Sequence, residues 1–188
     1  MRFSVSSIAA LCLSLLALSA CGSSEKRRLA NMTNPGLCPN IFVLSDAARV
    51  IDFAGEPALD TVAWSGEIRD VRTRCRYADD LPITAQVEID FAIGRGPAAQ
   101  TDMTDIKYFV AVTRANRDLI AKEEFKIPVR IDQGVATASF TKEIEDIIIP
   151  RKDANIGGAN FEIAVGFALT REQILYNRSG RSLKFQGL

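Results

Sequence analysis

Strict alternation of apolar and polar residues between Ile83 and Ile93 is the feature that most limits what this chain can form. Six apolar residues occupy every second position of the segment, namely Ile83, Ala85, Val87, Ile89, Phe91 and Ile93. A two-residue period places alternate side chains on opposite faces of a strand, so one face is buried and the other meets water. The segment therefore predicts a half-buried β-strand of an antiparallel sheet.

The residues just before this strand predict its hairpin partner. Three arginines, Arg72, Arg74 and Arg76, alternate with less polar residues, and residues 78–82 supply a turn. A hairpin folded at Asp79–Asp80 sets the arginines opposite a polar row, with Arg76 facing Thr84, Arg74 facing Gln86, Arg72 facing Glu88, and Asp90 nearby. Because this row includes acids, we favour a paired sheet surface. An anion-binding or partner-binding arginine face is the alternative.

Similar segments recur along the rest of the chain. Alternation marks residues 108–112, 119–131, 135–140, 144–149 and 161–169, with turns between them. Pro128 lacks an amide hydrogen for a sheet ladder, which predicts an edge or bulged strand. Short helices are expected only at Ser45–Val50 and Thr170–Leu175, each beginning with a capping residue. The predicted fold is an all-β, antiparallel, immunoglobulin- or fibronectin-like sandwich of seven or eight strands, one domain over residues 38–188.

Four cysteines divide by position. Cys12 lies in the apolar N-terminal segment, and Cys21 follows that segment directly. Cys38 and Cys75 remain as a pair, for which an oxidising compartment predicts a disulfide that ties the N-terminal segment to the arginine strand. Two unpaired buried thiols are the alternative, and a two-cysteine zinc site is disfavoured because the chain has no histidine.

Residues 1–20 have the parts of a signal peptide. Arg2 precedes an apolar run over residues 8–17, and small residues end the segment; the run is shorter than the roughly 20 residues that span a bilayer. Leu18-Ser19-Ala20-Cys21 resembles the lipobox of bacterial lipoproteins, which implies cleavage before Cys21 and its modification by acyl chains such as palmitate. Gly22 favours the outer membrane, and residues 21–37 read as a lipidated flexible tether.

The composition limits the chemistry. With no histidine, the chain lacks histidine-based catalytic triads and histidine metal sites. Acidic residues cluster at Asp79–Asp80 and at Glu143, Glu145 and Asp146, without a calcium-loop pattern, and are interpreted as solvated charges. Balanced charge gives no sign of nucleic-acid binding, and the sequence predicts no catalytic residue, metal or cofactor.

Several segments resemble uncharacterised Gram-negative envelope lipoproteins with a sandwich-like body. They are Cys38–Pro39, Gly94–Ala99, Tyr108–Arg114, Gly166–Thr170 and Tyr176–Arg178. The resemblance implies a location at the periplasmic face of the outer membrane, but no residue roles. We expect a non-enzymatic binding or scaffold module that contacts an unidentified envelope protein through loops or a sheet edge. The alternatives are a hydrolase with paired carboxylates and a carrier of lipid or small apolar ligands.

Overall fold

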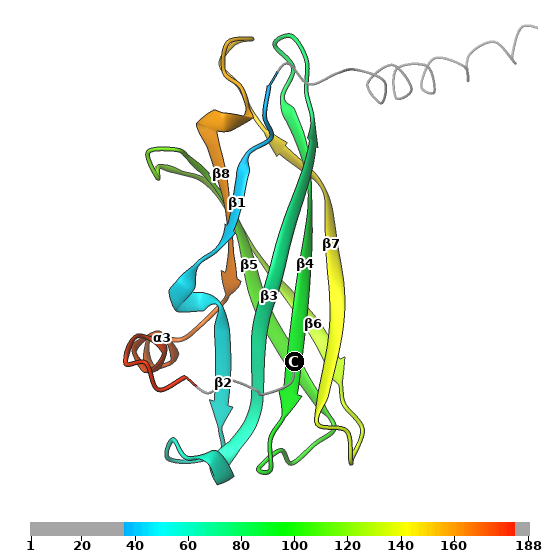
Figure 1. The fold of residues 1–188 in the computed structure, drawn as a ribbon, viewed down its shortest axis with the longest axis vertical. Coiled ribbons are helices and arrows are strands. Elements are labelled where there is room, and N and C mark those ends of the chain that lie inside the picture. Colours follow the sequence, from blue (N-terminus) through cyan, green and yellow to red (C-terminus); the bar gives the residue numbers. More distant parts are fainter. Residues whose placement is uncertain (1–35, 183–188) are drawn as a thin grey trace, which may run out of the picture.

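A computed structural model describes residues 36–182, which form two four-stranded sheets packed face to face (Figure 1). The first sheet has the order β1-β8-β5-β6, with bounds Asn40–Val43, Phe161–Phe167, Met103–Arg114 and Leu119–Arg130. The second has the order β2-β3-β4-β7, with bounds Arg49–Phe53, Val62–Arg76, Ile83–Arg95 and Thr137–Ile149. The predicted all-β sandwich is confirmed, and the described residues hold eight strands.

Two long hairpins and their connections build the sandwich. β3 and β4 form one hairpin, and β5 and β6 form the other. The chain crosses from the second sheet to the first between β4 and β5 and returns between β6 and β7, where β7 pairs with β4. β1 lies parallel to β8, while the other pairings are antiparallel. As a result, β6 and β7 are edge strands on the same side of the molecule.

The alternation in the sequence produces the core. Core-facing residues of both sheets are almost completely buried, among them Ile83, Val87, Ile89, Phe91, Ile93, Tyr108, Ile163 and Val165. Trp64 and Tyr77 belong to the same cluster. Burial of a large apolar side chain stabilises a fold by about 1.5–3 kcal/mol, so this cluster supplies most of the driving force. The space between the sheets is filled by side chains.

A single strand, β7 (Thr137–Ile149), replaces the two strands predicted over residues 135–140 and 144–149. β7 continues through residues 141–143, and its register against β4 shifts where Val87 faces Ile144 and Ala85 faces Ile147. Asp146 has a φ of 58° at this bulge. The pattern looked like two segments because Lys142 occupies a core-facing position between Phe140 and Ile144, before the bulge is reached.

The predicted disulfide fixes the start of the domain. Cys38 and Cys75 are bonded, with their Cα atoms 5.6 Å apart, and so join the segment that leads into β1 to β3. The Tyr77 hydroxyl donates to the Leu37 carbonyl oxygen at 2.8 Å and accepts from the Gly158 amide at 3.1 Å. The chain therefore enters the sandwich at the end that carries the β3–β4 turn, beside a loop from the opposite sheet.

The two predicted helices differ in outcome. α3, Arg171–Arg178, begins after Thr170, whose side chain caps it together with Gln173 as expected. The segment Ser45–Val50 is helical only in the 3-10 turn η1, Ser45–Ala47. Its later residues belong to β2 because Val50 pairs with Gly66 of β3, and sheet pairing outweighs the weak helical pattern. Two further 3-10 turns, η2 and η3, span Leu59–Thr61 and Gly158–Asn160.

Candidate functional site

The arginine row lies on the outer face of β3 in the predicted register. Arg72 faces Glu88, Arg74 faces Gln86 and Arg76 faces Thr84. Residues directly opposite in an antiparallel pair share a face, which is why counting outward from the turn gave the correct partners. Lys and Arg stems on such a face cover the sheet while their charged groups stay in water.

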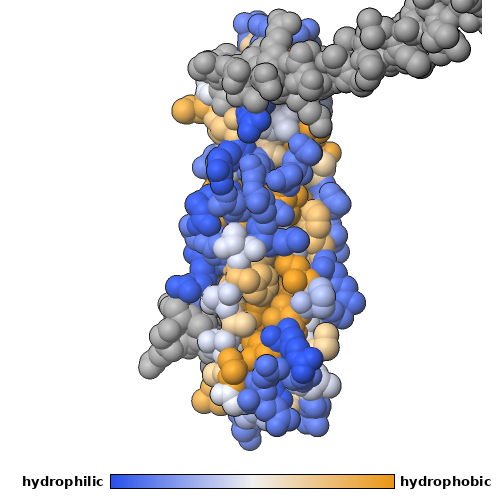
Figure 2. All heavy atoms as spheres, turned by 90° about the vertical axis from the view of Figure 1, so that its right-hand side faces the viewer, coloured by the Kyte–Doolittle hydropathy of each residue, from blue (hydrophilic) through white to orange (hydrophobic). Residues whose placement is uncertain are grey.

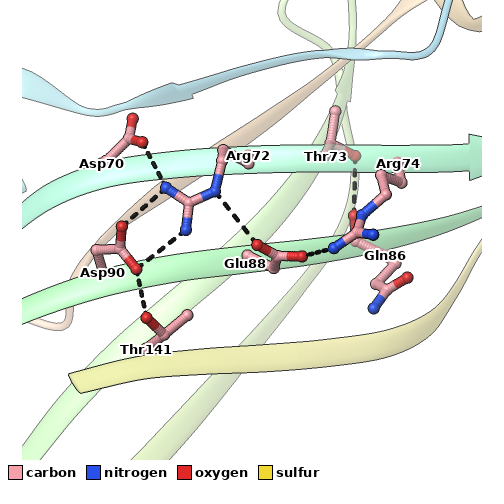
Figure 3. A network of polar contacts seen from close by, with 8 residues as sticks. All are labelled: Asp70, Arg72, Thr73, Arg74, Gln86, Glu88, Asp90 and Thr141. Atoms are coloured by element: carbon pink, nitrogen blue, oxygen red, sulfur yellow. Dashed lines mark hydrogen bonds and ion pairs between the residues drawn. The ribbon is translucent and has the colours of Figure 1, made fainter.

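Arg72 is the centre of an ion-pair network on this face (Figure 3). Its guanidinium donates to Asp70 at 2.6 Å, to Asp90 at 2.8 and 3.1 Å, and to Glu88 at 3.2 Å. Glu88 also pairs with Arg74, and Asp90 accepts a hydrogen bond from the Thr141 hydroxyl at 2.6 Å. These contacts, with Arg72 first, hold the pKa of Asp90 below its ordinary value.

The network bears on the two interpretations of the arginines. Arg72 and Arg74 are both engaged by carboxylates, so an incoming anion would compete with acids already in contact with them. Arg76 forms no ion pair with any residue between 36 and 182. The geometry is that of a paired sheet surface, and each exposed pair contributes only about 0–1 kcal/mol. An anion site on this face stays a prediction.

A second surface lies between edge strands β6 and β7, where the two sheets part. Viewed toward this side, apolar side chains form a strip with hydrophilic groups along both flanks (Figure 2). We call this strip the seam; its half-buried core-facing residues are Phe125 and Ile127 of β6 and Phe140, Ile144 and Ile147 of β7. They pack against the core yet remain partly open to water, because no further strand covers them.

Four aromatic rings cross the molecule beneath the seam. Phe125 of β6 stacks on Tyr108 at 5.1 Å between centroids, Tyr108 meets the edge of Phe91 at 5.1 Å, and Phe91 stacks on Phe140 of β7 at 5.5 Å. Aromatic pairs at such distances add about 0.5–1.5 kcal/mol beyond area burial. The row thus connects the two edges of the seam through the core.

One charged residue on each edge strand occupies a core-facing position. Glu123 of β6 lies opposite the buried Val110, and Lys142 of β7 lies opposite the buried Ile89, so both side chains are on the seam side of their strands. Both are exposed, and the described chain contains no ion pair that involves either. Burial, and then the Glu123 carboxylate, raise the pKa of Tyr108 to about 12. The negative charge of Glu123 therefore acts on the aromatic floor.

The opposite side of the sandwich is closed by α3. The Gln173 side-chain amide donates to Asp52 of β2 at 2.7 Å, and Tyr176 meets the edge of the Phe53 ring at 5.3 Å. The Asn177 amide donates to the Asp46 and Arg49 carbonyl oxygens, each at 2.9 Å. Helix α3 thus covers the β2 side, while β6 and β7 have no corresponding cover among residues 36–182.

The sequence contained a partial signal for the seam. Pro128 predicted an edge strand, and β6 is one, with Pro128 opposite Asp105. Glu123 and Lys142 interrupt the apolar alternation of their segments, as expected where a strand faces water on its core side. The sequence of one strand does not reveal that β6 and β7 lie side by side. That arrangement depends on the two points at which the chain crosses between the sheets.

The glycine-containing turn, the acidic residues and Cys21 are the remaining features that the sequence analysis singled out. Gly94–Pro97 ends β4, and the Gly96 amide donates to the Ala63 carbonyl oxygen at 2.8 Å, which supports a strand-ending turn. Asp79, with φ of 46°, lies in the β3–β4 turn. Within the described part of the chain, no cluster of three cysteine, aspartate or glutamate side chains is arranged to hold a metal ion. Cys21 and the predicted signal peptide, residues 1–20, lie outside the described residues.

Searches against protein-family models, curated proteins and solved structures returned no match to this chain. None of the helices between residues 36 and 182 is long and apolar enough to span a membrane. The resemblance to envelope lipoproteins and the location that it implies therefore stay predictions.

Proposed function

We propose that this chain is a lipoprotein held by Cys21 at the periplasmic face of the outer membrane. There the sandwich acts as a non-enzymatic binding or scaffold module that docks another envelope component through the seam. The observation that carries this proposal is the partly exposed apolar strip between β6 and β7. Apolar patches of several hundred Å² on a protein surface mark interaction sites.

The size of the seam supports docking of a macromolecule. β7 has 13 residues, which corresponds to a length of about 43 Å at about 3.3 Å per residue. Packed sheets lie about 10 Å apart, so the floor of the seam measures at most roughly 400 Å². That is within the range of apolar patches that serve as interaction sites on protein surfaces.

Two alternative functions have weaker support. A carrier needs a chamber for its ligand, whereas the space between the sheets is filled by residues such as Phe91, Tyr108 and Ile163. A hydrolase needs two carboxylates that flank its substrate. The facing acids Asp70 and Asp90 are both bound by Arg72, which holds them in a structural network.

The point at which the chain enters the domain suits a tethered module. Residues 22–37 separate Cys21 from the disulfide, and a segment of that length reaches at most about 60 Å. Because Cys38 is bonded to β3, a pull on the tether passes directly into the larger hairpin. The seam runs along the strands, away from this end, and so stays accessible to a partner in the periplasm.

Membrane fractionation and site-specific photo-crosslinking test the two parts of the proposal. The full chain would carry benzoylphenylalanine at Phe140 in the seam or, as a matched control, at Leu59, which is exposed on η2. We expect the protein in the membrane fraction, with a discrete crosslinked product from position 140 and none from position 59. The Cys21→Ser variant should move to the soluble periplasmic fraction.

Each part can fail separately. A Cys21→Ser variant that still fractionates as a processed, acylated membrane protein would refute the anchor. Equal crosslinking from positions 140 and 59 would refute the seam as a specific docking surface.

A further inference from the structure

We infer that the component docked at the seam is a second copy of this chain, related by a two-fold axis that runs parallel to the strands. The inference rests on the proposed function for the seam as a docking surface. It adds the identity of the partner and its orientation, and both follow from the two flanks.

Backbone pairing is not the mode of contact that these edges favour. Pro128 in β6 lacks a donor, the bulge at Asp146 bends β7, and Glu123 and Lys142 place charges on the core-facing sides of their strands. Prolines, bulges and inward-pointing charges are the features that prevent a sheet edge from adding a foreign strand. A partner must therefore bind through side chains, with its own apolar surface laid along the strip.

The two flanks of the seam carry charges of opposite sign on their core-facing sides, Glu123 on β6 and Lys142 on β7, and neither forms an ion pair with another residue between 36 and 182. The basic residues of β6 add no excess charge, because Lys122 is paired with Glu124, Lys126 with Asp105, and Arg130 with Asp102 and Asp132. A surface with an apolar centre, one acidic edge and one basic edge is complementary to itself once it is rotated.

Only one rotation brings unlike flanks together. With a two-fold axis parallel to the strands, β6 of each copy meets β7 of the other. With the axis in the interface but across the strands, β6 meets β6 and β7 meets β7, which sets like charges against each other. The parallel axis also leaves both Cys38 ends pointing the same way. That is the orientation that two chains anchored in one membrane require.

The two seam charges are placed to meet across this interface. Glu123 lies seven residues from Arg130 at the β6–β7 turn, and Lys142 lies five residues from Thr137 on the other side of that turn. At about 3.3 Å per residue these separations are about 23 Å along β6, which is tilted, and about 17 Å along β7. The two groups therefore lie at similar heights. In a parallel dimer, Glu123 of each copy faces Lys142 of the other copy, so the two-fold axis produces two such pairs.

Charge reversal with rescue tests the pairing. The full chain, solubilised in mild detergent, would be compared with Glu123→Lys, Lys142→Glu and the double variant by sedimentation equilibrium. We expect the wild type to be a dimer and each single variant to have a dimer dissociation constant about tenfold higher. The double variant should recover the dissociation constant of the wild type. Both residues are exposed, so these variants should keep the native circular dichroism spectrum. Arg76→Glu, on the outer face, is the matched control and should dimerise normally.

A zero-length carbodiimide crosslink tests the orientation. The carboxylate of Glu123 and the amine of Lys142 would be coupled in vesicles that contain a mixture of ¹⁴N- and ¹⁵N-labelled chains. We expect mixed-isotope peptides that join residue 123 to residue 142. Peptides that carry only a single isotope at this junction would show pairing within one chain and would overturn the inference.

The inference and the proposed function fail under different results. A chain that is monomeric at all concentrations, yet gives a discrete adduct from position 140 but not from position 59, overturns the second copy and leaves a different partner at the seam. A monomeric chain with no position-specific adduct overturns both. Single reversals that leave the dimer unchanged overturn the charge pairing and with it the parallel axis.

Discussion

Arg151 shows how one residue joins parts of the chain that are distant in sequence. Its guanidinium donates to the carbonyl oxygens of Leu81 at 2.7 Å, Asp79 at 2.5 Å, Ala78 at 3.1 Å and Ile156 at 3.0 Å. It also lies 4.8 Å from the centre of the Tyr77 ring. The planar guanidinium thereby links the β3–β4 turn to the loop before β8, next to the disulfide.

We predict that Arg151→Lys lowers the free energy of unfolding by about 2 kcal/mol, because an ammonium cannot reproduce these several directed hydrogen bonds. Urea denaturation of the full chain would measure the loss. Arg76→Lys at the same end of the molecule is the control and should change stability by less than about 0.5 kcal/mol. Equal losses in the two variants would show that the geometry at position 151 is not what matters.

Residue patterns predicted some contacts and missed others. The facing of Arg72 and Glu88 followed from counting along a hairpin, because both partners lie close to one turn. The role of Arg151 had no such signal, since three of its four carbonyl partners are about 70 residues away and any residue type supplies a carbonyl. Local spacing therefore predicted the ion-pair network around Arg72 but not the hydrogen bonds of Arg151.

At the scale of elements, α3 and the strand pair β6–β7 close the two sides of the sandwich differently. α3 packs against β2 through Gln173 and Tyr176, and Asp52 lies partly buried beneath it. Burial raises the pKa of Asp52, and the hydrogen bond from Gln173 opposes that rise. Because the native state binds this proton more tightly than the unfolded chain does, the ionised Asp52 costs stability at neutral pH.

Asp52→Asn should therefore be more stable than the wild type at pH 7, since asparagine keeps the acceptor oxygen for Gln173 and removes the charge. This advantage should shrink as the pH falls through the raised native pKa and vanish below the unfolded value near 3.8. Chemical denaturation at pH 7 and pH 3.5 would measure it. Asp60→Asn, exposed on η2, should show no such dependence; a constant difference at position 52 would contradict the burial account.

The elements themselves were largely predictable, and the reasons for the misses are physical. Alternation located β4, β5, β6, β8 and the second half of β3, and residues 62–70 of β3 were missed. β7 was divided in the prediction because Lys142 takes a core-facing position between Phe140 and Ile144 and so interrupts the apolar alternation. Ser45–Val50 has a capping serine, but the pairing of Val50 with Gly66 decided its structure. The seam required knowledge of which edges become neighbours, and that is set by the connections between sheets.

At the scale of the whole molecule, the sandwich has one end cross-linked by a disulfide, one side covered by a helix and one side without a cover among residues 36–182. The disulfide and Arg151 fix the end where the chain enters. A 37-residue separation between the two cysteines corresponds to about 3–4 kcal/mol in the chain-entropy model. α3 covers the β2 side, and the seam remains exposed along β6 and β7. This asymmetry is what the proposed anchored docking module requires.

Hydrogen exchange along the seam strands tests this account most directly. The amides of residues 119–130 and 137–149 would be followed by mass spectrometry for the full chain in membranes and for dilute Cys21→Ser protein. The account predicts slower exchange of these two segments in membranes, with unchanged exchange in β2 and α3, because the docked partner covers only the seam. The same exchange rates in both preparations would contradict it.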